Sequence, residues 1–253
     1  MSEFKAKQLA IVIPVKDDFE GLKKTLEAIW LDSRLGDGIE IAVIDAGSCE
    51  ETRQWLLIQD HRIAHIRSAQ DDGVYDAMNY GKNTVNASWI WFLGAGDLIE
   101  TATVHAVLDE IETWDAQEVH VFGVGIEQPE QGVPSHYPAR WDQSMIWRNT
   151  THHQGVLYSS ALFESLSFNA AHRVLADYGL HLTLFLRGIK ANLHPSMICK
   201  VASGGLSRRF NANLYREEWA VKKTILQGPK KWIHPVWLFA KYCFKKSGWP
   251  AAF

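Results

Sequence analysis

The chain contains little cysteine and no large excess of either charge. Among its 253 residues are three cysteines, Cys49, Cys199 and Cys243, which are odd in number and far apart. Such a set forms neither a disulfide framework nor a zinc knuckle, so we expect a reducing compartment, the cytoplasm. The formal net charge is −3, which gives no reason to expect nucleic acid as a partner.

Long apolar runs are missing as well. No run approaches the roughly 18 residues expected of a membrane-spanning helix, and the N-terminal segment MSEFKAKQLAIVIPVK lacks the cleavage site of a signal peptide. The composition still supports a large folded core, because 47% of the residues are apolar and 22% are charged. These proportions exclude the disordered class, and the length suits a single α/β domain.

Three motifs that identify common nucleotide-binding or hydrolase folds are absent. No G-x-G-x-x-G follows the first apolar run and no G-x-x-x-x-G-K-[ST] occurs, so neither a dinucleotide-binding fold nor a P-loop is supported. No G-x-S-x-G is present, which argues against an α/β-hydrolase.

What is present is an alternation of buried strands and amphipathic helices. The run LAIVIPV at 9–15 predicts a strand buried on both faces. Asp17 with Glu20, and Ser48 with Glu51, have the spacing of capping boxes at two helix starts. Further strands are predicted at 39–44, 62–67, 88–95, 118–127, 156–158 and 192–200, and helices at 17–30, 73–85, 101–114 and 177–187. This order predicts an α/β fold with a mostly parallel central sheet and flanking helices.

The chain is predicted to divide near residue 210. Residues 1–210 would form one domain, whose irregular region 128–155 is typical of a functional surface or cover. Residues 211–253 would form a helical extension. From 222 to 253 this extension carries seven lysines and no acids, mixed with aromatic residues. Pro235 is expected to interrupt its helix. The segment 222–253 suits an anionic membrane surface, or else a helix packed on the domain with a solvated lysine face.

Acidic residues gather where the predicted strands end, which is the edge where open parallel sheets bind ligands. The residues concerned are Asp17, Asp45, Asp71, Asp72 and Asp97. Each alone is a common turn residue. Together they favour a ligand, because like charges on one rim are costly unless a cation or a hydrogen-bond donor joins them. Such a rim suits a base edge, a ribose and a metal-bridged diphosphate.

Six segments occur in the order seen in a known family: LAIVIPVKDDFEGLKKTLEAI, IEIAVIDAGSCEET, DDGVYDAMNYGKNTVNASWIWFLGAGD, HHQG, LADYGLHL and GGLS. Over residues 8–207 the chain resembles the family 2 glycosyltransferases of the GT-A fold, and in particular a branch of bacterial exopolysaccharide and colanic-acid assembly. The resemblance implies the nucleotide-diphospho-sugar transferase fold. It also implies inverting transfer of a hexosyl or N-acetylhexosaminyl group from a UDP-sugar to a hydroxyl of a glycan or lipid-linked saccharide.

The resemblance assigns roles to residues at matching positions. Asp97 would be the last acid of a D-x-D motif and would hold Mn²⁺ or Mg²⁺, and Asp177 would be the general base. His153 and Gln154 would lie on the acceptor side. Asp45 would accept from a uracil-type N–H. The donor-binding set as a whole would be Pro14, Val15, Asp45, Ser48, Asp71, Gly73, Asp76 and Asn79.

Two departures from the family pattern bear on these roles. The D-x-D position reads Gly94-Ala95-Gly96-Asp97, which leaves one carboxylate. One carboxylate is enough if the ion takes its other ligands from diphosphate and water. Gly179 stands where an acid often follows the base.

Alternatives remain open at this point. Asp177 could be a helix N-cap, and Tyr75 and Met78 could be packing residues. The whole chain could be a non-catalytic partner that binds a nucleotide sugar or a glycan. A nucleotidyltransferase is disfavoured, because PVKDDFEG lacks the glycine-rich basic loop of that class.

Overall fold

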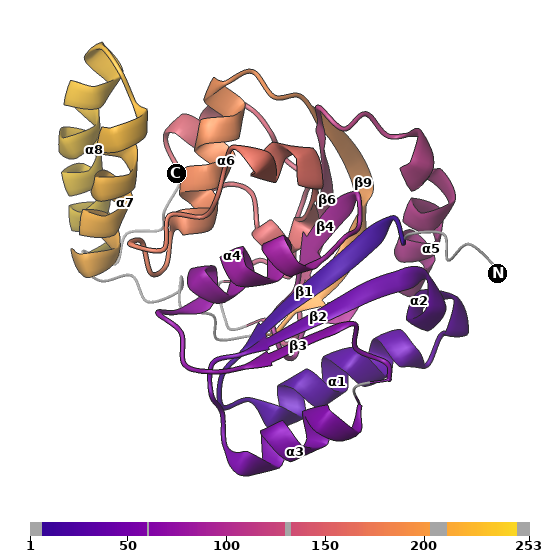
Figure 1. Cartoon of the computed structure of the whole chain (residues 1–253). Coiled ribbons are helices and arrows are strands. Elements are labelled where there is room, and N and C mark those ends of the chain that lie inside the picture. Colours follow the sequence, from indigo (N-terminus) through magenta and orange to yellow (C-terminus); the bar gives the residue numbers. More distant parts are fainter. Residues whose placement is uncertain (1–6, 60, 130–132, 203–211, 247–253) are drawn as a thin grey trace.

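The structure is a computed structural model that describes residues 7–59, 61–129, 133–202 and 212–246 (Figure 1). In this part of the chain nine strands form one sheet, in the order β3-β2-β1-β4-β8-β6-β9-β5, with β7 paired to β6. The α/β class predicted from the sequence is therefore confirmed. The predicted boundary near residue 210 and the GGLS segment at 204–207 lie outside the described residues.

Four parallel strands form the first half of the sheet. They are β1 (Leu9–Val15), β2 (Ile39–Asp45), β3 (His65–Ser68) and β4 (Trp89–Phe92). Every residue of β1, β2 and β4 is buried. Continuous apolar runs are expected for strands covered on both faces, and this explains why these strands could be predicted.

Helices cover both faces of this half. On one face, α1 (Phe19–Trp30) packs Leu22 and Leu26 in a core cluster with Ile11. On the other face, α4 (Val74–Thr84) packs Met78 with Val12. Figure 1 shows α1 and α3 (Glu50–Ile58) on the side of the sheet opposite α4. The carboxyl ends of β1–β3 consequently remain as the open edge.

The second half of the sheet is mixed rather than parallel. It contains β5 (Leu98–Ile99), β6 (Val119–Ile126), β7 (His136–Tyr137), β8 (Val156–Ser159) and β9 (Ala191–Val201). β8 runs antiparallel to both β4 and β6, whereas β6 and β9 are parallel. Antiparallel neighbours need no helical crossover, so the strand–helix alternation that indicates parallel pairing is lost here.

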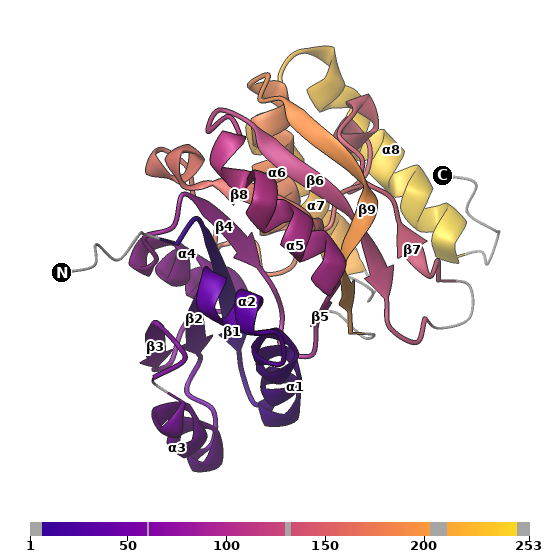
Figure 2. The ribbon, with the colours of Figure 1, turned by 90° about the vertical axis from the view of Figure 1, so that its right-hand side faces the viewer.

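Two helices lie on opposite faces of this second half. The core residues Val104 and Val107 of α5 (Thr101–Glu110) pack in the cluster that contains Phe122, while Leu180 of α6 (Ala176–Leu186) packs in the cluster that contains Val121. Figure 2 shows α5 in front of β6 and β9, with α6 and α7 behind. The shorter elements are α2 (Ser33–Gly38), η1 (Ile111–Thr113), η2 (Gln143–Ile146), η3 (His153–Gly155) and η4 (Ser160–Glu164).

The two predicted capping boxes are wrong. The N-cap of α1 is Asp18, whose side chain accepts a hydrogen bond from the Gly21 N–H at 3.0 Å. The N-cap of α3 is Cys49, without a side-chain cap. The Ser48 hydroxyl instead accepts from the Asp17 N–H at 2.8 Å. A tertiary contact between two strand ends has thus replaced the local contact that the spacing predicted.

The C-terminal extension forms α7 (Ala212–Ile225) and α8 (Pro229–Lys246). α8 continues through Pro235, so the predicted interruption is wrong. Val221 and Leu226 share a core cluster with Tyr178 and Leu182 of α6, which shows that α7 packs on the preceding domain. In the described ranges, no helix has the length and hydropathy needed to cross a bilayer.

Candidate active site

Asp45 and Ser48 join the ends of the first three strands. The Asp45 carboxylate is 0% exposed and accepts from the Ser48 N–H at 3.0 Å and from the Ser68 hydroxyl. The Ser48 hydroxyl reaches back to the residues after β1. These contacts are internal, so in this conformation Asp45 shapes the rim of the sheet. Its predicted contact with a nucleobase stays a prediction.

Pro14 and Val15 lie at the same rim, where β1 ends. They are in register with Ile44 and Asp45 of β2, and both are buried. The Val15 carbonyl accepts from the N–H of Ala46 at 2.9 Å. The structure therefore brings the predicted residues of β1 and β2 together, as the parallel pairing required.

The start of α4 supplies a second part of the rim. Gly73 is the N-cap, and its φ of 122° lies in the region that favours glycine. Asp71 Oδ1 accepts from the Gly73 N–H at 3.0 Å, whereas Asp71 Oδ2 is buried without a hydrogen-bond partner. Asp76 follows in the first turn and accepts from the Asp72 N–H at 3.4 Å. An unpaired buried carboxylate oxygen is costly, and a ligand hydroxyl would satisfy it.

Asn79 has contacts of another kind. Its amide nitrogen donates to the Phe168 carbonyl at 2.8 Å, and its amide oxygen accepts from the Phe168 N–H at 3.0 Å. Both ends of the amide therefore anchor the segment that precedes α6. A donor-binding role for Asn79 stays a prediction.

Asp97 lies at the turn after β4 and is 3% exposed. Its Oδ2 accepts from the Gly94 N–H at 2.7 Å, and its Oδ1 accepts from the Ala202 N–H at 3.1 Å, just after β9. Gly96 makes this turn possible, with φ at 88°. Burial raises the pKa of Asp97, although these N–H groups and the Gln154 side chain oppose the shift.

Asp177 lies in the first turn of α6 and is 7% exposed. The N-cap is Leu175, so the alternative in which Asp177 merely caps the helix is wrong. Its Oδ2 is 3.0 Å from His153 Nδ1, and its Oδ1 accepts from the Tyr75 hydroxyl at 3.0 Å. Burial would raise the pKa of Asp177, but the hydrogen bond and charge of His153 outweigh burial and hold it at about 2. The carboxylate is therefore ionised at neutral pH.

The neighbouring residues His153 and Gln154 connect the two acids. The His153 ring pairs with Asp177, while the Gln154 side chain lies near enough to Asp97 to lower the pKa of that carboxyl slightly. The Gln154 carbonyl is fixed from behind by Trp91 Nε1, at 2.7 Å. Three segments that are far apart in the sequence thus meet in one place: the turn after β4, η3 and the start of α6. The four residues lie close together in the structure, and the roles that the sequence predicted for them stay predictions.

Tyr75 belongs to this site, although the sequence indicated only a packing residue. Its hydroxyl donates to Asp177 and also to the Val174 carbonyl at 2.9 Å. Burial, followed by the nearby Asp177 charge, raises the pKa of Tyr75 well above its usual value, so the phenol stays a donor. The sequence indicated a role in the site only through the neighbouring Asp76, which belongs to a segment that resembles the family. Behind Asp177, burial lowers the pKa of His181 to about 4, which keeps that ring neutral.

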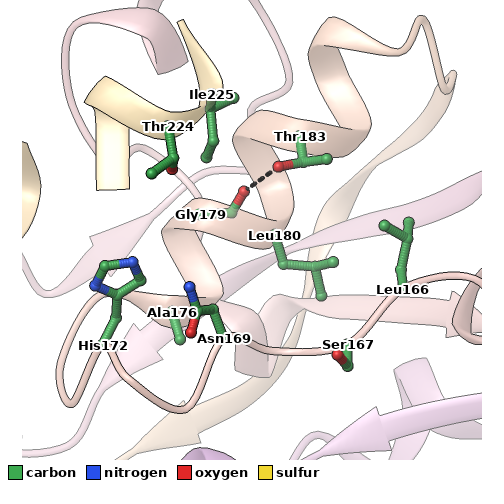
Figure 3. A pocket seen from close by; sticks show the side chains of 10 residues that line it. All are labelled: Leu166, Ser167, Asn169, His172, Ala176, Gly179, Leu180, Thr183, Thr224 and Ile225. Atoms are coloured by element: carbon green, nitrogen blue, oxygen red, sulfur yellow. Dashed lines mark hydrogen bonds between the residues drawn. The ribbon is translucent and has the colours of Figure 1, made fainter. Parts of the chain in front are cut away.

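A small pocket lies on another face of α6 (Figure 3). Its volume is about 200 Å³, and none of the predicted donor or acid residues line it. Ligand pockets for drug-sized molecules usually measure about 300–1,000 Å³, so this pocket is too small for a nucleotide sugar. Its lining residues are Leu166, Ser167, Asn169, His172, Ala176, Gly179, Leu180, Thr183, Thr224 and Ile225.

Gly179, which departs from the family pattern by replacing an acid, lies where α7 packs on α6. A Cβ at this position would lie 3.2 Å from Val221 Cγ1 of α7. The absence of a side chain lets α7 pack closely on α6, and an acid would meet apolar α7 atoms there. The acceptor-side contact that an acid could make is therefore replaced by helix packing.

A divalent metal fits Asp97 only as a site with a single protein carboxylate. Each carboxylate oxygen accepts one N–H bond and keeps lone pairs, and among the described titratable groups His153 is the one whose charge lowers the pKa of Asp97. Among the described residues, no group of three or more His, Cys, Asp or Glu side chains could hold a metal. Mn²⁺ or Mg²⁺ would need the diphosphate and water as its remaining ligands.

These features define a class of protein, the sugar transferases with a GT-A type sheet. Residues 10–179 match the sequence profile of the family described as Glycosyl transferase family 2. This match covers more than half of the chain. The chain belongs to the family 2 glycosyltransferases, and this membership implies a nucleotide-sugar donor.

Curated relatives carry the same activity in their names. A PGL/p-HBAD biosynthesis glycosyltransferase of Mycobacterium bovis (strain BCG / Pasteur 1173P2) is 30% identical over 191 residues, which cover 71% of this chain and 70% of the relative. An uncharacterized glycosyltransferase of Mycobacterium tuberculosis (strain ATCC 25618 / H37Rv) is 29% identical over 112 residues, 44% of this chain and 42% of that one.

Solved structures agree on the fold. Residues 1–349 of S. aureus TarS in complex with UDP-GlcNAc match with a TM-score of 0.68 and 12% identity, over 94% of this chain and 73% of that one. The mannosyltransferase PcManGT of Pyrobaculum calidifontis, in complex with GDP-Man and Mn²⁺, matches with a TM-score of 0.58 and 16% identity, over 94% and 70%. The chain spans 43% of a longer TarS chain. At these identities the likeness shows the fold alone, and the predicted GT-A fold is confirmed.

Proposed function

We propose that this protein is an inverting glycosyltransferase that moves a sugar from a UDP-sugar to a hydroxyl of a glycan or lipid-linked saccharide. The pathway would be the synthesis of bacterial cell-surface polysaccharide. The observation that carries the proposal is that His153, paired with Asp177 at 3.0 Å, acts on the pKa of both Asp177 and Asp97, with Gln154 beside it. A donor-side acid and an acceptor-side acid, held by adjacent residues, suit a reaction at one anomeric carbon. Family membership also favours an enzyme over a non-catalytic binding partner.

The donor would lie along the rim formed by the strand ends and the start of α4. Ser48 and the buried ends of β1 and β2 would border the base, while Asp71 Oδ2 would accept from a ribose hydroxyl. The buried oxygen of Asp71 without a partner supports this assignment. The first turn of α4 leaves backbone N–H groups that can face negative charge.

Asp97 would hold Mn²⁺ or Mg²⁺ together with the diphosphate. When bound, the ion would supply positive charge to the leaving group. The chain's own contribution is to keep the Asp97 carboxylate fixed, through the Gly94 and Ala202 N–H groups.

Asp177 and His153 would act as the base. The acceptor hydroxyl loses its proton to this pair while its oxygen bonds to the anomeric carbon, and the bond from that carbon to the diphosphate oxygen breaks. Asp177 supplies the negative charge and holds the ring by Nδ1, which leaves Nε2 as the ring atom that can relay the proton. Attack opposite the leaving group inverts the anomeric centre.

Calorimetry with UDP, GDP, UDP-glucose, UDP-GlcNAc and GDP-mannose, with and without Mn²⁺, tests the donor assignment. We expect UDP compounds to bind, and Asp97→Ala to weaken the Mn²⁺-dependent part at least about tenfold. Asp142→Ala is the matched control, since Asp142 also accepts a backbone N–H at a turn, from Ser144 at 2.7 Å.

Each contrary result has a distinct meaning. A preference for GDP would make the UDP assignment wrong. Unchanged Mn²⁺-dependent binding in Asp97→Ala would remove the metal role of Asp97. The absence of binding by every nucleotide would remove the proposed donor site.

A further inference from the structure

The helix α8 exposes an apolar face to solvent. Trp232, Val236 and Phe239 are 79%, 70% and 69% exposed, and Ile233 and Cys243 are exposed beside them. The spacing of 232, 236, 239 and 243 places these residues on one side of a helix. From Trp232 to Cys243 no exposed residue carries a charge. We call this set, with Pro235, the α8 stripe.

The opposite face of α8 is already used for packing. His234 is fully buried, and its Nε2 is 2.8 Å from the Ile146 carbonyl. Leu238 is buried, and Lys241 pairs with Glu218 of α7 at 3.1 Å. Figure 1 shows α8 on the periphery, beside α7. The helix is therefore held by one face, while the α8 stripe has no role in the fold.

The charges around the α8 stripe indicate what covers it. A lysine pair, Lys230 with Lys231, stands at the start of the helix, and Lys230 is exposed. If two copies of α8 packed side by side in parallel, the two lysine pairs would lie against each other, which is repulsive. An anionic surface would instead attract this end of the helix.

We propose that the α8 stripe docks flat on an anionic lipid bilayer, with the apolar side chains in the interface and the Lys230–Lys231 pair at the headgroups. The helix would lie in the plane of the membrane, since no described helix can cross it. Aromatic residues such as Trp232 and Phe239 suit this depth. This inference is independent of the proposed function, because it uses none of the residues assigned to sugar transfer.

Flotation of the full chain with vesicles tests the docking. We expect binding to vesicles of phosphatidylcholine with phosphatidylglycerol, and partitioning at least about tenfold weaker to phosphatidylcholine alone. The triple variant Trp232→Ser, Val236→Ser and Phe239→Ser should lose binding at least about tenfold. The matched control replaces three apolar residues that are equally exposed elsewhere, Leu31→Ser, Leu57→Ser and Ile58→Ser, and should bind like the wild type.

A charge variant gives a second test that leaves the apolar face intact. Lys230→Glu with Lys231→Glu should abolish the preference for the anionic vesicles, whereas Arg187→Glu with Lys190→Glu changes the net charge equally and should not. Thermal unfolding of each variant checks that the fold is kept.

Four results would overturn the docking. These are no wild-type flotation with anionic vesicles, equal flotation with neutral vesicles, wild-type flotation of the triple variant, and loss of flotation in the serine control. A wild-type dimer that becomes a monomer in the triple variant, with no flotation of either, would identify a second copy as the occupant.

Discussion

The turn after β4 and the start of α6 each bury one carboxylate, and the pKa values of the two carboxylates shift in opposite directions. Asp97 has backbone N–H groups and an amide around it, and burial raises its pKa. Asp177 has an imidazole beside it, and its pKa falls to about 2. Burial raises the pKa of both carboxyl groups, so the opposite directions come from the neighbouring groups, and above all from the His153 ring that pairs with Asp177.

Removal of the Asp177 charge should have the largest effect. Asp177→Asn keeps the side-chain shape but removes the negative charge of the base pair, so we expect sugar transfer to fall about a thousandfold or more. Donor binding should stay nearly unchanged. The assay is product formation under saturating UDP-sugar, with calorimetry for the donor.

The matched control for this variant is Asp32→Asn. Asp32 also pairs with a histidine, His105, at 3.0 Å, but it does so at the start of α2. Loss of transfer in this control, or wild-type transfer in Asp177→Asn, would mean that the Asp177–His153 pair is not the base.

The two acids should also give stability profiles of opposite slope. The folded-state pKa of Asp177 is depressed from 3.8 to about 2, so its contribution is complete above pH 3.8 and lost as pH falls toward 2. This shift corresponds to about 2 kcal/mol. The folded-state pKa of Asp97 is raised, so its contribution is present below pH 3.8 and is lost as pH rises through the folded-state pKa.

Urea unfolding across pH separates these contributions. Asp177→Asn should reduce the loss of unfolding free energy that wild type shows as pH falls below 3.8. Asp97→Asn should gain unfolding free energy relative to wild type as pH rises. Equal slopes for the two variants would contradict the contrast between the two sites.

A smaller effect on stability and transfer is expected from substitution of Tyr75, whose hydroxyl donates to Asp177. Tyr75→Phe removes one donor to the carboxylate, which should cost about 1 kcal/mol of unfolding free energy. Transfer should fall about tenfold, with unchanged Mn²⁺-dependent binding. Tyr80→Phe is the control, because Tyr80 lies on the same helix and is exposed. Equal effects of the two variants would remove Tyr75 from the site.

Much of the fold could be predicted because β1, β2 and β4 are covered on both faces. Continuous apolar runs such as LAIVIPV are typical of strands that are buried on both faces. The second half gave a weaker signal, since β5 has two residues and β8 pairs without a crossover helix. The short helix α2 was not predicted, because it contains two glycines and glycine disfavours helix formation.

The residues of the candidate site also fall into those that the sequence could predict and those that it could not. Asp97, Asp177, His153 and Gln154 could be predicted as one site because the order of the motifs matches a known family. Tyr75 could not be separated from packing residues, since its role depends on a hydroxyl that reaches α6, far along the chain. The internal contacts of Asp45 and Asn79 were equally hidden, because their partners are set by tertiary structure.

His153 and Gln154 are joined by a single peptide unit, and this has a consequence for how such an enzyme can change. Consecutive Cα atoms are about 3.8 Å apart, so the separation of the two acids is tied to one short, rigid piece of backbone. Under the proposed function, changes in the region 133–151 or around α4 would alter specificity. The distance between Asp97 and Asp177 would stay constant meanwhile.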